Sequence, residues 1–186
     1  MGSKKKTNLF GWIFAALMLV GLVLVVVGMC IGNINMTLAG RTETITLFDE
    51  SWETLKEANN ALETNLPQPT FGIIAFVVTL VGAAILVLDA VLRIALKKDF
   101  KLIRMIGAAV TLIGAILILV AGLVLASDFN SYYDELNKIA GDIGNLFGKD
   151  LEVKPYSAGA GVWLGFIGGL VAAVAGGLST LKVFNK

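Results

Sequence analysis

The chain has 186 residues, of which 56% are hydrophobic and only 16% are charged, and its formal net charge is +1. Soluble domains are about half apolar and about a quarter charged, so this balance indicates a membrane protein and gives no reason to expect a nucleic-acid partner. The sequence has no histidine and one cysteine, Cys30, so no intramolecular disulfide can form, and we expect no enzyme active site, no metal and no cofactor.

Four apolar runs are long enough to cross a bilayer, whose hydrocarbon core of roughly 30 Å needs about 20 helical residues. They cover residues 9–31, 71–92, 105–126 and 158–181. A chain in hydrocarbon must satisfy its own backbone hydrogen bonds, so each run is predicted to be a helix. The expected fold class is an all-α membrane protein, a four-transmembrane-helix bundle.

The segments between the spans differ in charge. They are a tail over 1–8, a first loop over 32–70, a link over 93–104, a second loop over 127–157 and a tail over 182–186. Ten of the fifteen lysines and arginines lie in the two tails and the link, and twelve of the fourteen acids lie in the two loops. Because cations accumulate on the cytoplasmic side, both termini and the link are predicted to be cytoplasmic and both acidic loops extracellular.

The first loop has the pattern of a β-hairpin followed by a helix. Alternating apolar residues over 34–38 and β-branched residues over 44–48 flank a plausible turn at Gly40 and Arg41. A helix is expected to follow from about residue 51, because apolar residues then recur on one helical face. These residues are Trp52, Leu55, Ala58 and Leu62.

The second loop has a clear helical period that predicts an amphipathic helix. Its apolar residues follow one another at steps of three and four: Phe129, Tyr132, Leu136, Ile139, Ile143 and Leu146. Ser131 and Asp134 resemble a capping box at its start. Leu151 and Val153 alternate with charged residues, which favours a third short strand.

The hairpin and the two amphipathic helices are expected to form a small extracellular α/β cap, because an isolated hairpin is only marginally stable. The alternative is that both helices lie flat on the outer leaflet, where tryptophan and tyrosine are favoured. The apolar and aromatic residues of the cap are our candidates for a partner-binding surface. They are Trp52, Leu55, Tyr132, Leu136 and Ile139.

Small residues recur at every fourth position of the last span. They are Gly161, Gly165, Gly169, Ala173 and Gly177. Such a stripe lets two helix backbones approach closely in a membrane. We expect it to pack inside the bundle, and the alternative is a contact with another subunit.

Asp89 is the one ionisable residue predicted inside a span. It lies about one turn from the cytoplasmic end, and Arg93 follows at i+4 on the same helical face. An ion pair between Asp89 and Arg93 is therefore the expected arrangement. A proton or cation site at Asp89 is the alternative, because intramembrane acids are frequently functional.

In layout the chain resembles the claudin-like four-span group. The termini are inside, the link between the second and third spans is short, the first loop opens with strands, and the second loop extends the third span. Claudins also carry a Gly-Leu-Trp motif and a cysteine pair in the first loop, whereas here Trp52 lacks that context and no cysteine pair exists. The resemblance covers topology only, and the missing disulfide favours a prokaryotic plasma membrane.

These features predict a non-enzymatic membrane protein that acts by helix packing and by contacts of its extracellular loops. We expect a structural or accessory subunit of a membrane assembly, with a copy of itself or another membrane protein as its partner in the lipid bilayer. The alternative is an oligomeric channel or small transporter. An enzyme would require outer carboxylates such as Glu50, Glu53 and Asp134 to act together, and nothing in their spacing indicates this.

Overall fold

The computed structural model describes residues 9–38, 41–50, 52–53, 56–57, 68–96, 100–144 and 156–181, and only the backbone at 37, 38, 41, 133 and 135–144. Within this part of the chain, four helices are long and apolar enough to cross a membrane. They are α1 (Leu9–Cys30), α3 (Thr70–Leu96), α4 (Lys101–Gly144) and α5 (Ala160–Leu178). The prediction of four apolar helices is therefore confirmed.

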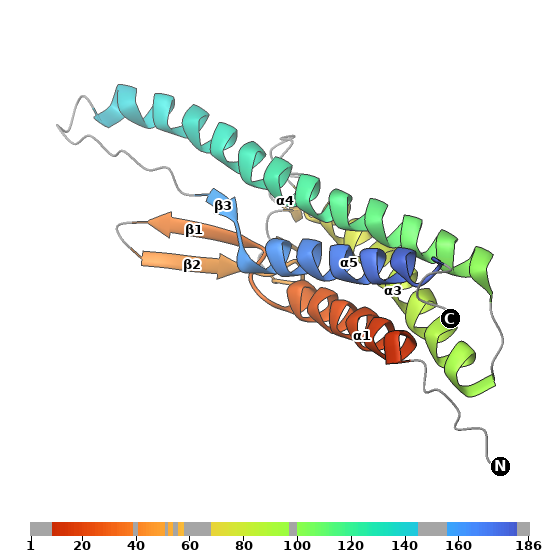
Figure 1. Ribbon diagram of the computed structural model, residues 1–186. Helices are drawn as coiled ribbons and strands as arrows, with labels where there is room; N and C mark the ends of the chain where they lie inside the picture. Colours follow the sequence, from red (N-terminus) through yellow and green to blue (C-terminus); the bar gives the residue numbers. More distant parts are fainter. Residues whose placement is uncertain are drawn as a thin grey trace, which may run out of the picture.

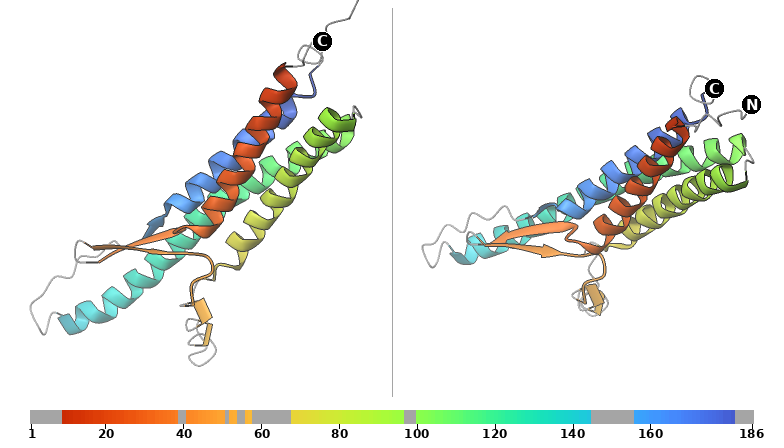
Figure 2. Two further views of the ribbon diagram at one scale, coloured as in Figure 1. Left: turned by 90° about the horizontal axis from the view of Figure 1, so that it is seen from below. Right: turned by 60° about the horizontal axis from the view of Figure 1, so that its bottom comes forward.

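The four helices form one elongated bundle (Figure 1). α5 lies between α1 and α4, and α3 packs against both α4 and α1. The start of α1, the end of α3, the start of α4 and the end of α5 lie at one end of the bundle, which we call the link end. A small sheet lies at the other end, which we call the cap end, and the two further views show the same separation (Figure 2).

Helix α4 is much longer than the bundle requires. It runs without a break over 44 residues, from Lys101 to Gly144, which corresponds to roughly 66 Å. The amphipathic helix expected in the second loop is a continuation of the third span. Ser131 and Asp134 lie within this helix, so the capping box expected at a helix start is wrong. The reason is local, because no proline or glycine interrupts residues 123–140.

The sheet has three antiparallel strands in the order β2-β1-β3. They are β1 (Ile34–Leu38), β2 (Arg41–Ile45) and β3 (Tyr156–Ala158). The predicted hairpin is confirmed, but its second strand ends at Ile45 instead of continuing to residue 48. Leu47 instead turns inward, where it is buried against Gly72 at the start of α3. The third strand lies later than expected, and the residues 151–153 on which that prediction rested fall outside the described part of the chain.

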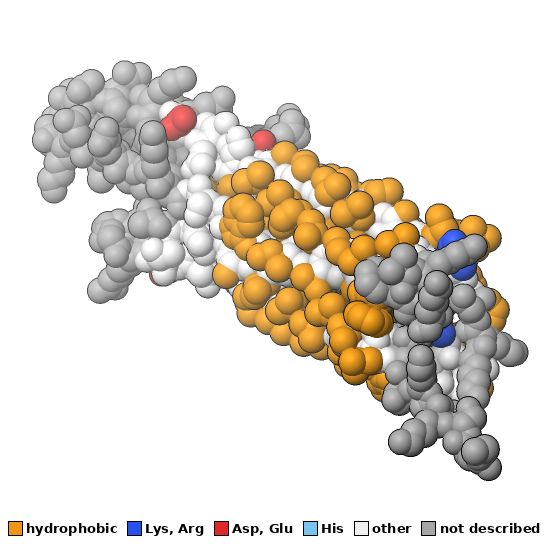
Figure 3. Space-filling view, viewed as in Figure 1, with side chains coloured by type: hydrophobic (Ala, Val, Ile, Leu, Met, Phe, Trp, Pro, Cys, Tyr) orange, Lys and Arg blue, Asp and Glu red, His pale blue; other side chains and the backbone are white. Residues whose placement is uncertain are grey.

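Residue size is distributed unusually between the interior and the surface of the bundle. Most glycines of the helices are buried, and many large side chains such as Val81, Ile113 and Trp163 are exposed. The exposed apolar side chains form a belt, with lysine and arginine at the link end and acidic side chains at the cap end of the face shown (Figure 3). This arrangement is compatible with a multi-pass membrane protein.

Candidate functional site

A buried ion pair joins three helices at the link end. Nε of Arg104, on α4, donates to Oδ2 of Asp89, on α3, over 2.7 Å. Nη1 of Arg104 also donates to the backbone carbonyl oxygen of Ser179 over 2.9 Å, at the end of α5. The side chains of Asp89 and Arg104 are each 1% exposed. Arg104 therefore links α3, α4 and the carbonyl end of α5, where a positive charge is favourable.

The partner of Asp89 differs from the sequence-based expectation. Arg104 had been counted among the cations of the link, whereas the structure places it inside the bundle against Asp89. Arg93 lies one turn beyond Asp89 on α3 and is half-buried. Contact between Asp89 and Arg93 remains a prediction. The second carboxylate oxygen of Asp89, Oδ1, is buried and accepts no hydrogen bond within the described part of the chain.

Three members of the small-residue stripe of α5 lie against other helices of the same bundle. A Cβ atom added to Gly161 would lie 2.5 Å from the carbonyl oxygen of Gly28 on α1. One added to Gly165 would meet the ring of Phe76 on α3, and one added to Gly169 would lie 2.7 Å from Cβ of Ala115 on α4. The stripe thus allows α5 to pack against three helices at once.

The last two members of the stripe differ from each other. Ala173 is buried, whereas a Cβ atom on Gly177 would meet nothing within 4 Å. A second close approach of α1 and α5 lies at Gly21 of α1 and Gly168 of α5, which is not part of the stripe. The helices are as close there as at Gly28 and Gly161. The tight surface of α5 is therefore wider than the every-fourth-residue pattern and ends before Gly177.

The cap is built around an aromatic cluster at the cap end of α4. Phe129 of α4 stacks on Tyr156 of β3, with ring centroids 4.9 Å apart. The ring centroid of Trp52 lies 5.8 Å from that of Phe129, and the two rings are tilted by 48°. Nε1 of Trp52 donates to the carbonyl oxygen of Thr46 over 2.7 Å. Ile34 of β1 packs in the same cluster. The cluster therefore holds the sheet against the extension of α4.

Asn130 of α4 pairs with β3 in the manner of a further strand. Its Nδ2 donates to the carbonyl oxygen of Tyr156 over 2.9 Å, and its Oδ1 accepts from the backbone N–H of Tyr156 over 3.1 Å. One side-chain amide thus satisfies both main-chain groups of a residue in an edge strand. Exposed strand edges are prone to unwanted pairing, so Asn130 also protects this edge.

The five residues proposed as a partner-binding surface do not all lie on the surface of the cap. Trp52 is only 6% exposed, so it belongs to the core of the cap rather than to its surface. Tyr132 is half-buried on α4. Leu55 falls outside the described part of the chain, and for Leu136 and Ile139 only the helical backbone is described.

An acidic hollow is lined by residues that follow β2 in the chain. Its lining consists of Phe48, Asp49, Glu50, Glu53 and Glu57. Phe48 is 58% exposed. The described residues contain no group of three or more histidine, cysteine, aspartate or glutamate side chains placed to hold a metal ion. The hollow is thus an exposed acidic surface with one apolar side chain.

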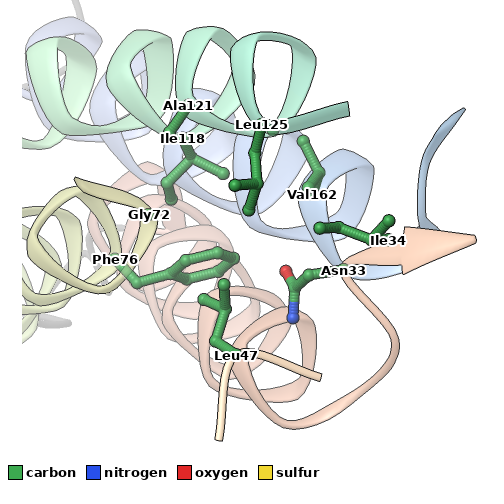
Figure 4. A pocket seen from close by; sticks show the side chains of 10 residues that line it. Asn33, Ile34, Leu47, Gly72, Phe76, Ile118, Ala121, Leu125 and Val162 are labelled. Atoms are coloured by element: carbon green, nitrogen blue, oxygen red, sulfur yellow. The ribbon is translucent and has the colours of Figure 1, made fainter. Parts of the chain in front are cut away.

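Asn33 marks the junction of the bundle and the cap (Figure 4). It is 1% exposed, and its Nδ2 donates to the carbonyl oxygen of Ile31 over 2.7 Å. Its Oδ1 has no hydrogen-bond partner in the described residues and points toward a narrow cavity of about 10 Å³. Such a volume holds about one water molecule, which requires two to four polar partners. The other lining side chains are apolar, and the volume is far below the roughly 300 Å³ of a small-molecule pocket.

The chain matches no protein-family model, and no curated protein or solved structure matches it either. The comparisons therefore lend no support to the resemblance in layout to claudins.

Proposed function

We propose that this protein is a non-enzymatic structural or accessory subunit of a membrane assembly, and that its contact surface is the cap. One observation carries this proposal. The close-packed glycines and the buried acid, which in other membrane proteins can join subunits, make their contacts here within a single chain. Gly21, Gly28, Gly161 and Gly168 pack against one another inside one chain, and Asp89 is neutralised by Arg104 of the same chain. The cap is the exposed surface outside the apolar belt, and we assign the contacts to it.

The construction of the cap supports this role. It projects beyond the apolar belt (Figure 3), and the aromatic cluster and Asn130 attach it to α4. A surface attached in this way loses little conformational freedom when it binds, which favours affinity. The acidic side chains at its base favour a partner with basic groups.

We propose a plasma membrane location with both termini and the link in the cytoplasm. The distribution of lysine and arginine supports this orientation, which places the cap outside the cell. The lack of a cysteine pair in the loops supports a prokaryotic source.

Site-specific photo-crosslinking in intact membranes tests the proposed contact surface. A photoreactive phenylalanine derivative would replace Phe48 or Ser157, which are exposed on the cap, in separate full-length variants. Matched controls carry it at Val81 or Ile113, which are exposed in the apolar belt. We expect a discrete protein adduct from the cap positions and lipid adducts from the belt positions. The proposal is wrong if the belt positions give the protein adduct and the cap positions give none.

A further inference from the structure

The last span and the last strand form one continuous piece of backbone. β3 ends at Ala158, and α5 begins two residues later at Ala160. The N–H of Gly159 donates to the carbonyl oxygen of Asn33 over 2.7 Å, and the N–H of Gly161 donates to that of Gly32 over 2.9 Å. The pairing of β3 with β1 and the packing of α5 on α1 therefore depend on the same junction.

The partners of α5 are distant in sequence. Its closest approach is to α1, the first span, where a Cβ atom on Gly168 would lie 2.7 Å from the carbonyl oxygen of Gly21 and 2.9 Å from the backbone nitrogen of Val25. Its far end is held by Arg104 through the carbonyl of Ser179. It also has the lowest mean hydropathy of the four apolar helices. These contacts form only when the rest of the bundle is present to receive α5.

Helices α3 and α4 also share close contacts in which no residue of α5 takes part. They are neighbours in sequence, and they approach closely where Gly82 faces Thr111 and where Gly114 faces Thr79. The hydroxyl of each threonine donates to a carbonyl of its own helix over 2.7 Å, so neither is left unpaired in this interface. The charges of Asp89 and Arg104 also neutralise each other within this pair of helices.

We propose that the docking of α5 completes both the helix bundle and the cap in one step. In a chain whose last span is undocked, β3 is absent from the sheet and Tyr156 is absent from the aromatic cluster. The α3–α4 pair persists in that state, because its interface does not require α5. The outer surface therefore forms only in a chain that has been assembled through to its last span. This inference concerns how the cap is made and does not depend on what the cap binds.

Amide hydrogen exchange of the full-length protein in mild detergent, read by mass spectrometry, tests this coupling. Gly168→Leu places a side chain against the backbone of α1 and should undock α5. Gly177→Leu is the matched control on the same helix, because a Cβ atom there meets no neighbour within 4 Å. We expect Gly168→Leu to lose protection in α5 and in residues 34–38 and 156–158, with protection kept in α3 and α4. The amide protection of Gly177→Leu should equal that of the unsubstituted protein in all of these segments.

A second measurement follows the cap directly. In a background with Trp12→Phe and Trp163→Phe, Trp52 is the remaining tryptophan, and both removed side chains are exposed in the belt. With Gly168→Leu, the emission of Trp52 should move to longer wavelength and become more accessible to a soluble quencher. Retention of β1 and β3 protection with α5 unprotected would overturn the coupling. If α3 and α4 lose protection together with α5, the α3–α4 pair does not persist on its own. If α5 stays fully protected in Gly168→Leu, α5 does not pack against the backbone of α1 at this position.

Discussion

Arg104 of α4 and Asp89 of α3 form a 2.7 Å ion pair inside the bundle, although 15 positions separate them in the sequence. An isolated charge in the middle of a membrane helix is costly to insert, by about 2.5–3.5 kcal/mol on insertion scales. Here the pair lies near the link end, and the two charges face each other across neighbouring helices, so each lowers the cost of burying the other. The link end of the bundle is thereby fixed by one cation that also reaches α5.

Breaking this pair should destabilise the protein strongly. Asp89→Asn removes the counter-charge of the buried Arg104 guanidinium. Arg104→Gln likewise removes the counter-charge with which the buried Asp89 carboxylate is paired. Removing one partner of a buried pair typically costs about 3–5 kcal/mol. The free energy of unfolding, measured by denaturant titration in detergent, should fall by this amount in each single variant.

The double variant Asp89→Asn with Arg104→Gln distinguishes pairing from general sensitivity of the region. It removes both charges with the same substitutions as the single variants, so its loss of stability should be clearly smaller than the sum of the two single losses. If the losses are additive, Asp89 and Arg104 do not stabilise each other.

The close approach of α1 and α5 should be intolerant of a single methyl group. A Cβ atom on Gly28 would lie 2.6 Å from both the carbonyl oxygen of Gly161 and the backbone nitrogen of Gly165. Gly28→Ala should therefore lower the free energy of unfolding by about 1–3 kcal/mol through overpacking. Gly177→Ala is the control, and it should be neutral or slightly stabilising because alanine favours the helix. Equal behaviour of the two variants would contradict the close approach.

Asn130 should stabilise the cap more than the bundle. Asn130→Ala removes two hydrogen bonds to Tyr156, each contributing about 1 kcal/mol. Amide exchange of residues 156–158 should accelerate, while exchange within α3 stays unchanged. Ser131→Ala alters the exposed neighbouring residue and should leave the strand protected. Faster exchange in both variants would indicate a general effect on α4 instead.

The proposed orientation can be checked with a membrane-impermeant thiol reagent. In a Cys30→Ser background, Glu43→Cys places an exposed thiol on β2 and Lys101→Cys places one at the link end. Intact cells should be labelled at position 43 and labelled at position 101 only after permeabilisation. The reverse pattern would place the cap in the cytoplasm.

The channel or transporter alternative predicts a measurable flux. The structure places Asp89 in an ion pair that is 1% exposed, so we expect reconstituted liposomes to show the same ion and proton flux as empty vesicles. Flux that is present with the unsubstituted protein and lost with Asp89→Asn would favour a transport role instead.

The sequence was sufficient for the four helices and for the hairpin, because both depend on local patterns. The small-residue stripe could also be found from its spacing, since an every-fourth-residue repeat defines one face of a helix. The helix start read from the capping box at Ser131 and Asp134 was wrong. A change from an apolar to an amphipathic period alters which residues are buried, but it does not end a helix when no residue disfavours helical backbone.

The partner of Asp89 could not be found from neighbours on the same helix. Arg93 satisfies the i+4 rule, whereas Arg104 lies on the next helix, α4. A search across helices would have found it, because Asp89 lies seven residues before the end of α3 and Arg104 lies three residues after the start of α4. In an antiparallel pair these positions have similar depth. Asn130 gave no such signal, because a single asparagine on an amphipathic helix is ordinary.

The placement of small residues inside the bundle and bulky ones outside has a practical consequence. The helices are held by shape and by close backbone approach, not by the nature of the surrounding solvent. Polar residues introduced at outward positions such as Val81, Ile113 and Trp163 would leave every interior contact in place. The fold is therefore a suitable template for a water-soluble analogue that presents the same cap without detergent.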